Sequence, residues 1–235
     1  QFRSGEVAWL LNDNRTPIVW GQNIGEDVYP VLNRQQVYAT YPCLSFSNEA
    51  FASEKKEHKC DEGGTCTECG VATKPAVIDD VYQISNEAQL YWFAGLVNGT
   101  LTDGSGSNAS ANAVLTSDIT VNRGVLNEDG SLAATSGLKE WTPIGVSGNN
   151  SFKGTFDGQG HTISGLYLDT TSDYVGLFGW THIASISNVR VTDSYLKGND
   201  KVGGVIGFAF AGLVTNCSNE GSVSGTREVG GVIGH

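Results

Sequence analysis

Apolar residues in the C-terminal half of the chain occur in short runs that alternate with polar residues and are divided by glycine, asparagine and aspartate. The pattern returns at a fixed interval, because Gly176-Leu-Phe-Gly179, Gly204-Val-Ile-Gly207 and Gly231-Val-Ile-Gly234 start 28 and 27 residues apart. Alternating runs of three to five residues predict short strands, and fixed-period repetition predicts stacked units that share one core. We therefore predict a mainly β protein, a right-handed parallel β-helix with three strands and three corners per turn. Glycine is expected to supply positive φ at the corners.

The repeats also predict which side chains fill the core. Ile186-Ser-Asn-Val189 aligns with Val214-Thr-Asn-Cys217 at an interval of 28 residues. A single unit cannot bury its own apolar face, so its neighbours must cover it. Cys217 takes the position of Val189 one coil later, which predicts a buried and inert thiol. The other residues expected to point inward are Leu177, Phe178, Ile186, Val189, Val205, Ile206, Val214, Val232 and Ile233.

Ahead of the repeats the pattern predicts a helix between strands. Tyr82–Ile84 and Ala113–Val121 have strand composition, whereas the apolar residues over 86–98 follow helical spacing. Ser85 is the expected N-cap and Gly99 the residue that ends the helix. We expect this helix to cap the N-terminal end of a β-helix domain that covers 81–235.

Two smaller segments precede this domain. Residues 1–40 are predicted to form a small α+β module, with a helix over 5–11 and strands over 17–20 and 27–32. Residues 41–75 hold four of the five cysteines and few apolar residues. A segment with so little core needs a cross-link or a metal to hold one conformation.

Composition narrows the choice of partners. The chain carries 25 acidic against 14 basic residues, a net charge of −11, which argues against a nucleic-acid or anionic-membrane partner. No apolar run reaches the roughly 18 residues that a membrane span needs. Methionine is absent, the sequence opens with Gln1 and it stops directly after a repeat. We expect it to be a piece of a longer, processed polypeptide.

The repeats and the segments before them resemble a known family. Gly154-Thr-Phe-Asp-Gly-Gln-Gly-His-Thr-Ile-Ser-Gly-Leu166, followed by the three Gly-x-x-Gly repeats, resembles the GLUG-repeat bacterial surface proteins. Residues 82–98 are similar to the helix that precedes such arrays. Residues 4–12 and 20–27 resemble a module found between arrays in large secreted proteins of gut bacteria. The resemblance implies a parallel β-helix, an extracellular or cell-surface location and an adhesive or architectural role.

The cysteine-rich segment is the one place where we expect metal chemistry. Cys66-Thr-Glu-Cys69-Gly70 has the form of a zinc knuckle, in which two thiolates reach one metal from a tight turn. The resembling module shows a Cys, then a His, then Gly-x-Cys-x-x-Cys-Gly, which implies a structural zinc held by Cys43, His58, Cys66 and Cys69. Cys60 is the alternative to Cys43. Disulfides among the four local cysteines are the competing interpretation, natural for a secreted chain.

Other chemistry-bearing residues receive structural interpretations. Asp157-Gly-Gln-Gly-His161 is expected to form a corner, with Asp157 bonding its own turn. The charged residues of the repeats are expected to be scattered over corners with no matching pair on successive coils; these are Asp193, Lys197, Asp200, Lys201 and Glu228. Four aromatic residues could stack on sugars but more often close the core of a solenoid; these are Trp141, Tyr167, Tyr174 and Trp180.

These observations favour a non-catalytic segment of a large secreted or cell-surface protein. It would act as an adhesin, a display scaffold or a structural component of a wall or fibre. Its partner would be a host glycan or protein, or a second copy of itself. Two alternatives remain: the non-catalytic arm of a surface peptidase or glycosidase, and a carbohydrate-active enzyme built on the β-helix.

Overall fold

The computed structural model describes residues 20–23, 31–32, 37–38, 73–133 and 137–235, and for 20–38 it describes the backbone alone. The three short strands of 20–38 and the long body of 73–235 belong to two separate compact units. The cysteine-rich ligands and the predicted helix over 5–11 lie outside the described residues. In the first unit, β1 (Trp20–Asn23) lies between β2 (Val31–Leu32) and β3 (Val37–Tyr38). β1 starts where the predicted strand over 17–20 ends.

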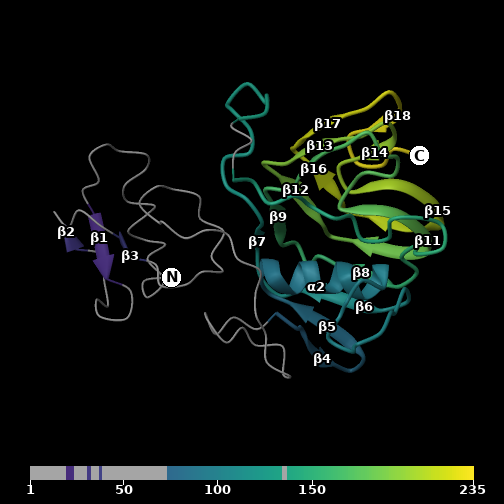
Figure 1. The fold of residues 1–235 in the computed structure, drawn as a ribbon. Coiled ribbons are helices and arrows are strands. Elements are labelled where there is room, and N and C mark those ends of the chain that lie inside the picture. Colours follow the sequence, from purple (N-terminus) through teal and green to yellow (C-terminus); the bar gives the residue numbers. More distant parts are fainter. Residues whose placement is uncertain (1–19, 24–30, 33–36, 39–72, 134–136) are drawn as a thin grey trace. The chain divides into compact units, whose positions relative to one another are not determined.

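The second unit is a parallel β-solenoid, as the repeats predict (Figure 1). Its largest sheet has six strands in the spatial order β15 (Ile206–Thr215), β11 (Phe178–Ser187), β8 (Thr155–Asp157), β6 (Asn112–Leu115), β5 (Val81–Ile84) and β4 (Ala76–Ile78). Only β4 runs antiparallel to its neighbour within this sheet. The five parallel strands each belong to a successive coil, so the solenoid has about five turns.

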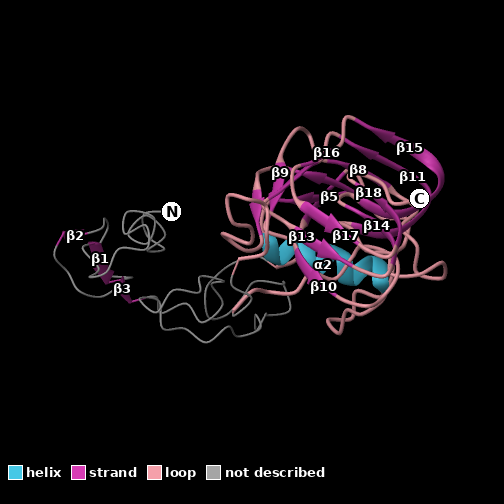
Figure 2. Ribbon diagram, turned by 90° about the horizontal axis from the view of Figure 1, so that it is seen from above, coloured by secondary structure: helices cyan, strands magenta, loops and turns pink. Residues whose placement is uncertain are grey.

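Three smaller sheets form the other sides of the coils (Figure 2). One contains β7 (Ile119–Thr120), β9 (Thr162–Ser164), β12 (Arg190–Thr192) and β16 (Ser218–Asn219). Another contains β10 (Tyr167–Asp169), β13 (Tyr195–Lys197) and β17 (Ser222–Ser224). The last pairs β14 (Asp200–Gly203) with β18 (Arg227–Gly230). The last full coil therefore has four strands, one more than the three predicted per turn.

The register reproduces the sequence repeat. Tyr167 pairs with Tyr195, which pairs with Ser222, at intervals of 28 and 27 residues. The early coils are longer, because Val81 pairs with Asn112 and Ala113 with Phe156. Loops fill the extra length. The predicted strand over 113–121 is divided into β6 and β7 by a short bend over 116–118. The sequence repeat thus sets the C-terminal coils, while insertions shape the N-terminal ones.

The helix α2 (Glu87–Asn98) lies where the sequence predicts it, although its N-cap is Asn86. The side chain of Asn86 accepts a hydrogen bond from the backbone N–H of Gln89, while Ser85 donates to the side chain of Gln89 instead. Gly99 ends the helix in the left-handed conformation, at φ 71°. Nine of the twelve helical residues are buried, so α2 is enclosed on nearly all sides by the coil below it and by the loops around it.

Most residues expected to point inward form the core, but burial falls toward the C-terminal coil. Val189, Val205 and Ile206 are at most 1% exposed, as are Leu177, Phe178 and Ile186. Val214, Val232 and Ile233 pack against this core yet are only half-buried. Among the described residues, no further coil covers their outer side.

Glycine supplies positive φ at some turns of the solenoid, as predicted, for example at Gly160 and Gly165, while non-glycine residues such as Tyr174 also adopt a positive φ. The glycines of the three Gly-x-x-Gly repeats have another role, because none of them has a positive φ. A Cβ on Gly204 would lie 2.5 Å from the carbonyl oxygen of Gly231 in the next coil. Gly231, in the last coil, would meet nothing. The repeat glycines are therefore required because successive coils approach too closely for a side chain.

Candidate functional site

The candidate metal ligands Cys43, His58, Cys66 and Cys69, with the alternative Cys60, lie outside the described residues. Within 73–133 and 137–235, no three His, Cys, Asp or Glu side chains come together as a metal site would require. In that same part of the chain, no helix combines the length and apolar character needed to cross a bilayer.

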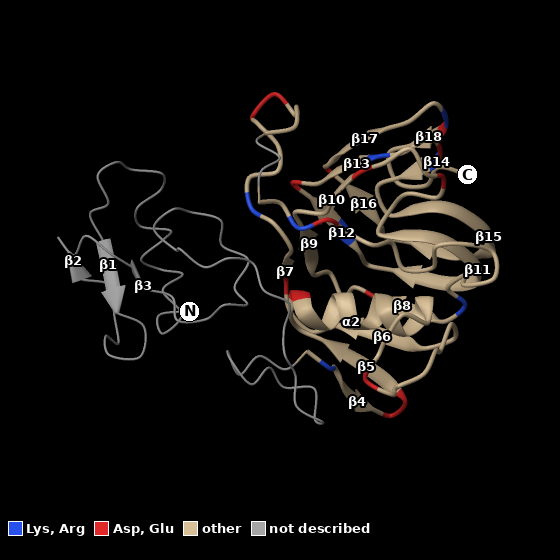
Figure 3. Cartoon of the chain, in the orientation of Figure 1, with Lys and Arg blue, Asp and Glu red and all other residues tan. Residues whose placement is uncertain are grey.

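The charged residues of the repeats are not scattered, which corrects the expectation from the sequence. Lys197 pairs with Asp169 at 2.9 Å, and Lys201 pairs with Glu228 at 2.9 Å, in each case across one coil-to-coil step. The pair between Arg190 and Glu220 is bidentate, with both carboxylate oxygens within 2.8 Å of the same guanidinium nitrogen. Figure 3 shows basic and acidic residues on the strands and loops of the solenoid. Opposite charges stacked at the repeat interval hold neighbouring coils together.

Asp200 is the best buried member of these pairs. Its side chain is 4% exposed and lies 2.9 Å from the ammonium of Lys201 and 2.8 Å from the guanidinium of Arg227. The hydrogen bond from Lys201 and the charge of Arg227 hold the pKa of Asp200 below its usual range. The same contact with Asp200, together with Glu228, raises the pKa of Lys201. Asp193, by contrast, accepts from the backbone N–H groups of Val125 and Leu126 and so anchors a loop.

The corner predicted at Asp157–His161 is confirmed. Asp157 accepts hydrogen bonds from the backbone N–H of Gln159 and from the side chain of Asn188 in the next coil. Asn188 in turn accepts from Asn216 one coil further on. The side-chain ladder of one aspartate and two asparagines explains this corner as a structural feature.

Cys217 faces the core, as predicted, but it is only half-buried because no described coil covers it. Its thiol lies 3.3 Å from the carbonyl oxygen of Thr215, and burial raises its pKa. A raised pKa keeps the thiol protonated and unreactive at neutral pH. The raised pKa of Cys217 supports the prediction of an inert thiol. The prediction of a buried thiol is met only in part.

A cavity of about 420 Å³ opens beside β10 and is the candidate ligand site among the described residues. One wall is the segment 140–146 and the other is the segment 168–175 that follows β10. Two acidic residues line it, Glu140 and Asp173, together with the aromatic residue Tyr174. Hydroxyl groups of Thr142, Thr170 and Ser172 add donors and acceptors. The volume falls within the range of about 300–1,000 Å³ that small-molecule sites occupy.

Hydrogen bonds hold both walls of the cavity, and those on the 140–146 wall are buried. Asn98, at the end of α2, donates to the carbonyl oxygen of Pro143 at 2.9 Å and accepts from the backbone N–H of Gly145 at 2.8 Å. Asp173 accepts from the side chain of Asn199 at 2.9 Å on the neighbouring coil. These bonds fix the walls of the cavity in position, which lowers the entropic cost of binding.

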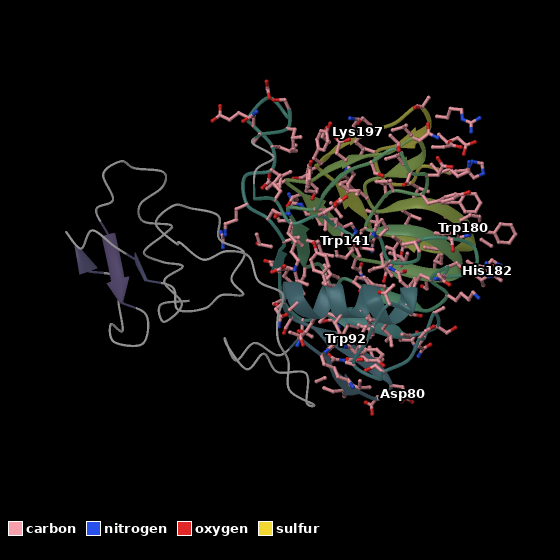
Figure 4. All side chains as sticks on the ribbon, in the orientation of Figure 1. Asp80, Trp92, Trp141, Trp180, His182 and Lys197 are labelled. Carbon is pink, nitrogen blue, oxygen red and sulfur yellow. The ribbon has the colours of Figure 1, made fainter. Side chains whose placement is uncertain are left out.

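Tyr174 joins the cavity to a group of aromatic side chains on the outer surface. Its ring centroid lies 4.5 Å from that of Trp180, which lies 4.6 Å from that of Phe208. Phe208 stacks on His235 at 5.1 Å, and His182 stacks on Phe210 at 5.2 Å. Trp180 and His182 point outward from β11 in Figure 4. Side chains at equivalent positions on successive coils thus form an aromatic ladder next to the cavity.

The four aromatic residues singled out from the sequence have different surroundings in the structure. Trp141 is 1% exposed and donates its indole N–H to the carbonyl oxygen of Gly176, so it belongs to the core. Tyr167 stacks on Tyr195 one coil on. Tyr174 and Trp180 belong to the outer group. Glu140, Asp173 and Phe208 were missed by sequence reasoning, although the 28-residue interval from Trp180 to Phe208 was a signal for the ladder.

Part of this chain is similar in sequence to a small part of a much longer protein. No protein-family model matches the chain. Halomucin from Haloquadratum walsbyi is 40% identical over 88 residues, which are 37% of this chain and 1% of halomucin. A crystal structure of a protein provisionally assigned as an immunoglobulin A1 protease, from Bacteroides ovatus, is similar at 16% identity and a TM-score of 0.34. That match covers 67% of this chain and 62% of the other.

Proposed function

We propose that this chain is a non-catalytic segment of a large secreted or cell-surface protein, in which the solenoid serves as a stiff, adhesive scaffold. The observation that carries the proposal is the pairing of outer charged residues across successive coils. The side chains of Asp200, Lys201 and Glu228 are engaged with one another or with Arg227, so this corner is organised for stability rather than for proton transfer.

Similarity to halomucin supports the same proposal. The matched 88 residues form 1% of that protein, so similar sequence occurs as a small part of a very long chain. The 27- and 28-residue register of the coils also fits the GLUG-repeat resemblance. We infer that the chain shares the surface location and architectural role which that resemblance implies.

Surface location can be tested with an antibody raised against this chain. Intact, non-permeabilised cells of the source organism should be labelled, and external protease should remove the label. Labelling that appears only after permeabilisation would contradict the proposed surface location.

The absence of catalysis is tested separately, by measuring turnover on a broad panel of glycan, uronan and peptide substrates. Turnover that disappears in an Asp173→Asn variant would contradict the non-catalytic role.

We further propose that Cys43, His58, Cys66 and Cys69 hold one structural zinc. The support is the spacing of these residues and the shortage of apolar residues over 41–75. Protein purified without chelator should contain about one zinc per chain, and Cys66→Ser should release it. Cys217→Ser is the matched control and should retain the metal.

Two further variants distinguish the alternative ligands. If Cys43→Ser retains the zinc and Cys60→Ser loses it, Cys60 rather than Cys43 is the ligand. Mass spectrometry showing two disulfides and no metal would refute the site.

A further inference from the structure

The cavity between 140–146 and 168–175 has a charge pattern that selects among small ligands. Both charged side chains that line it, Glu140 and Asp173, are acidic, and no lysine, arginine or histidine lines it. The Lys201 ammonium, 6.0 Å from the centre of the Tyr174 ring, is already paired with Asp200 and Glu228. An anionic ligand would therefore meet two carboxylates without a free cation to neutralise it.

The carboxylate of Glu140 is available to a ligand. Glu140 is exposed, and its side chain makes no hydrogen bond or ion pair with any residue that the structure describes. Its backbone is fixed nonetheless, because its carbonyl oxygen accepts from the hydroxyl of Tyr91 at 2.8 Å and it bridges to Tyr167. Asp173 is oriented by Asn199, which occupies one of its two oxygens. The cavity thus presents one oriented carboxylate and one free carboxylate as acceptors for hydroxyl groups.

Tyr174 lines the same cavity and supplies a rigid aromatic side chain. Its backbone is left-handed, at φ 64°, and its N–H donates to the carbonyl oxygen of Asp200 at 3.0 Å. Trp180 supports the ring from one side at 4.5 Å. An aromatic side chain immobilised in this way loses little further entropy when a ligand packs against it.

Hydrogen-bond acceptors and an aromatic side chain in one cavity match the chemistry of a sugar. A pyranose ring has an apolar C–H face that packs on an aromatic surface, and its edge carries hydroxyl donors that carboxylates accept. We propose that this cavity binds the terminal residue of a neutral glycan, with Tyr174 under the sugar ring and Glu140 and Asp173 on its hydroxyl groups. This proposal deepens the adhesive role proposed above and rests on it.

The probes are the methyl glycosides of glucose, galactose, mannose and N-acetylglucosamine, with methyl glucuronide as the anionic comparison. Ligand-detected NMR on the full chain should show binding of at least one neutral glycoside, with a Kd on the order of 1 mM, and no binding of the glucuronide. Glu140→Gln should weaken that binding about tenfold, because a charged acceptor is lost while the shape is kept. Since Glu140 is exposed, this variant should fold normally.

Two variants of Tyr174 distinguish the contribution of its ring to binding from that of its hydroxyl group. Tyr174→Ala should abolish detectable binding, whereas Tyr174→Phe should retain it within about twofold. Phe210→Ala is the control, since it removes an aromatic ring that is 54% exposed and does not line the cavity. Binding that survives both Tyr174→Ala and Glu140→Gln would overturn the proposal, as would equal binding of the glucuronide or no binding of any glycoside. Hydrolysis of a bound glycoside would instead contradict the non-catalytic role and leave the cavity assignment standing.

Discussion

The two ends of the solenoid are built from similar strands but are covered very differently. At the N-terminal end, α2 and its flanking loops enclose the core, and Phe93 is fully buried against Phe152 and Phe156. At the C-terminal end, Val223 takes the place of Leu196 in the register but is half-buried, whereas Leu196 is 1% exposed. The inward direction of a side chain is set within its own coil, but its burial depends on the next coil.

This difference indicates how stability is distributed. In a solenoid each coil contacts its neighbours alone, so the free energy of unfolding is close to a sum of coil and interface contributions. Residues that face a covered interface should therefore contribute far more than their equivalents in the last coil. Paired substitutions at equivalent positions measure this directly.

The largest effect is expected from Phe93→Ala in α2. Removing a fully buried ring at the covered end should lower the free energy of unfolding by about 3–5 kcal/mol. Val223→Ala, in the uncovered last coil, should cost less than about 1 kcal/mol. Urea denaturation followed by far-ultraviolet circular dichroism gives both values. Equal losses in the two variants would show that the last coil is covered in solution.

Asn98→Ala should produce the next largest effect. It removes both hydrogen bonds that hold Pro143 and Gly145 and leaves a buried carbonyl and N–H without partners, at a cost of about 1–3 kcal/mol. The amide hydrogen of Gly145 should also exchange faster. Asn219→Ala is the comparison at the other end, because its bonds with Gly221 lie where water can replace them. A similar loss in both variants would argue against a special role for Asn98.

Gly204→Ala and Gly231→Ala test the role of the repeat glycines. The added Cβ at Gly204 would lie 2.2 Å from the side chain of Asn219, so the variant should lose about 1–2 kcal/mol. The same change at Gly231 should stay within about 0.5 kcal/mol, because nothing lies within 4 Å. Thermal unfolding of the two variants in one buffer provides the comparison. A large loss at Gly231 would indicate that another surface packs on the last coil.

The sequence was sufficient for the fold and insufficient for the site. The Gly-x-x-Gly interval predicted parallel coils, and the helical spacing over 86–98 predicted α2, because both are periodic patterns. The expected positive φ is found at Gly160 and Gly165 but not in the Gly-x-x-Gly repeats, since close approach between coils leaves the same sequence signature as a positive φ. The cavity was not predicted because its walls, 140–146 and 168–175, are irregular segments brought together by the stacking. The charged pairs were missed because their partners lie a full coil apart.

The smallest effect concerns the ion pairs of Asp200, which connect β14 to β18 at the C-terminal end. The pKa of Asp200 is lowered in the folded chain, chiefly by the hydrogen bond from Lys201, while an unfolded aspartate has a pKa of about 3.9. Its contribution to stability is therefore complete above the unfolded pKa and is lost as the pH falls through the folded value. Asp200→Asn should lower Tm at pH 7, and the difference from the unmodified chain should shrink in acid, as the pH falls below the unfolded value of about 3.9 and Asp200 takes up a proton in the folded chain as well. Asp80→Asn, in the exposed turn between β4 and β5, is the control and should change Tm little at either pH. A difference for Asp200→Asn that stays constant with pH would show that shape and packing, rather than charge, account for its role between the last coils.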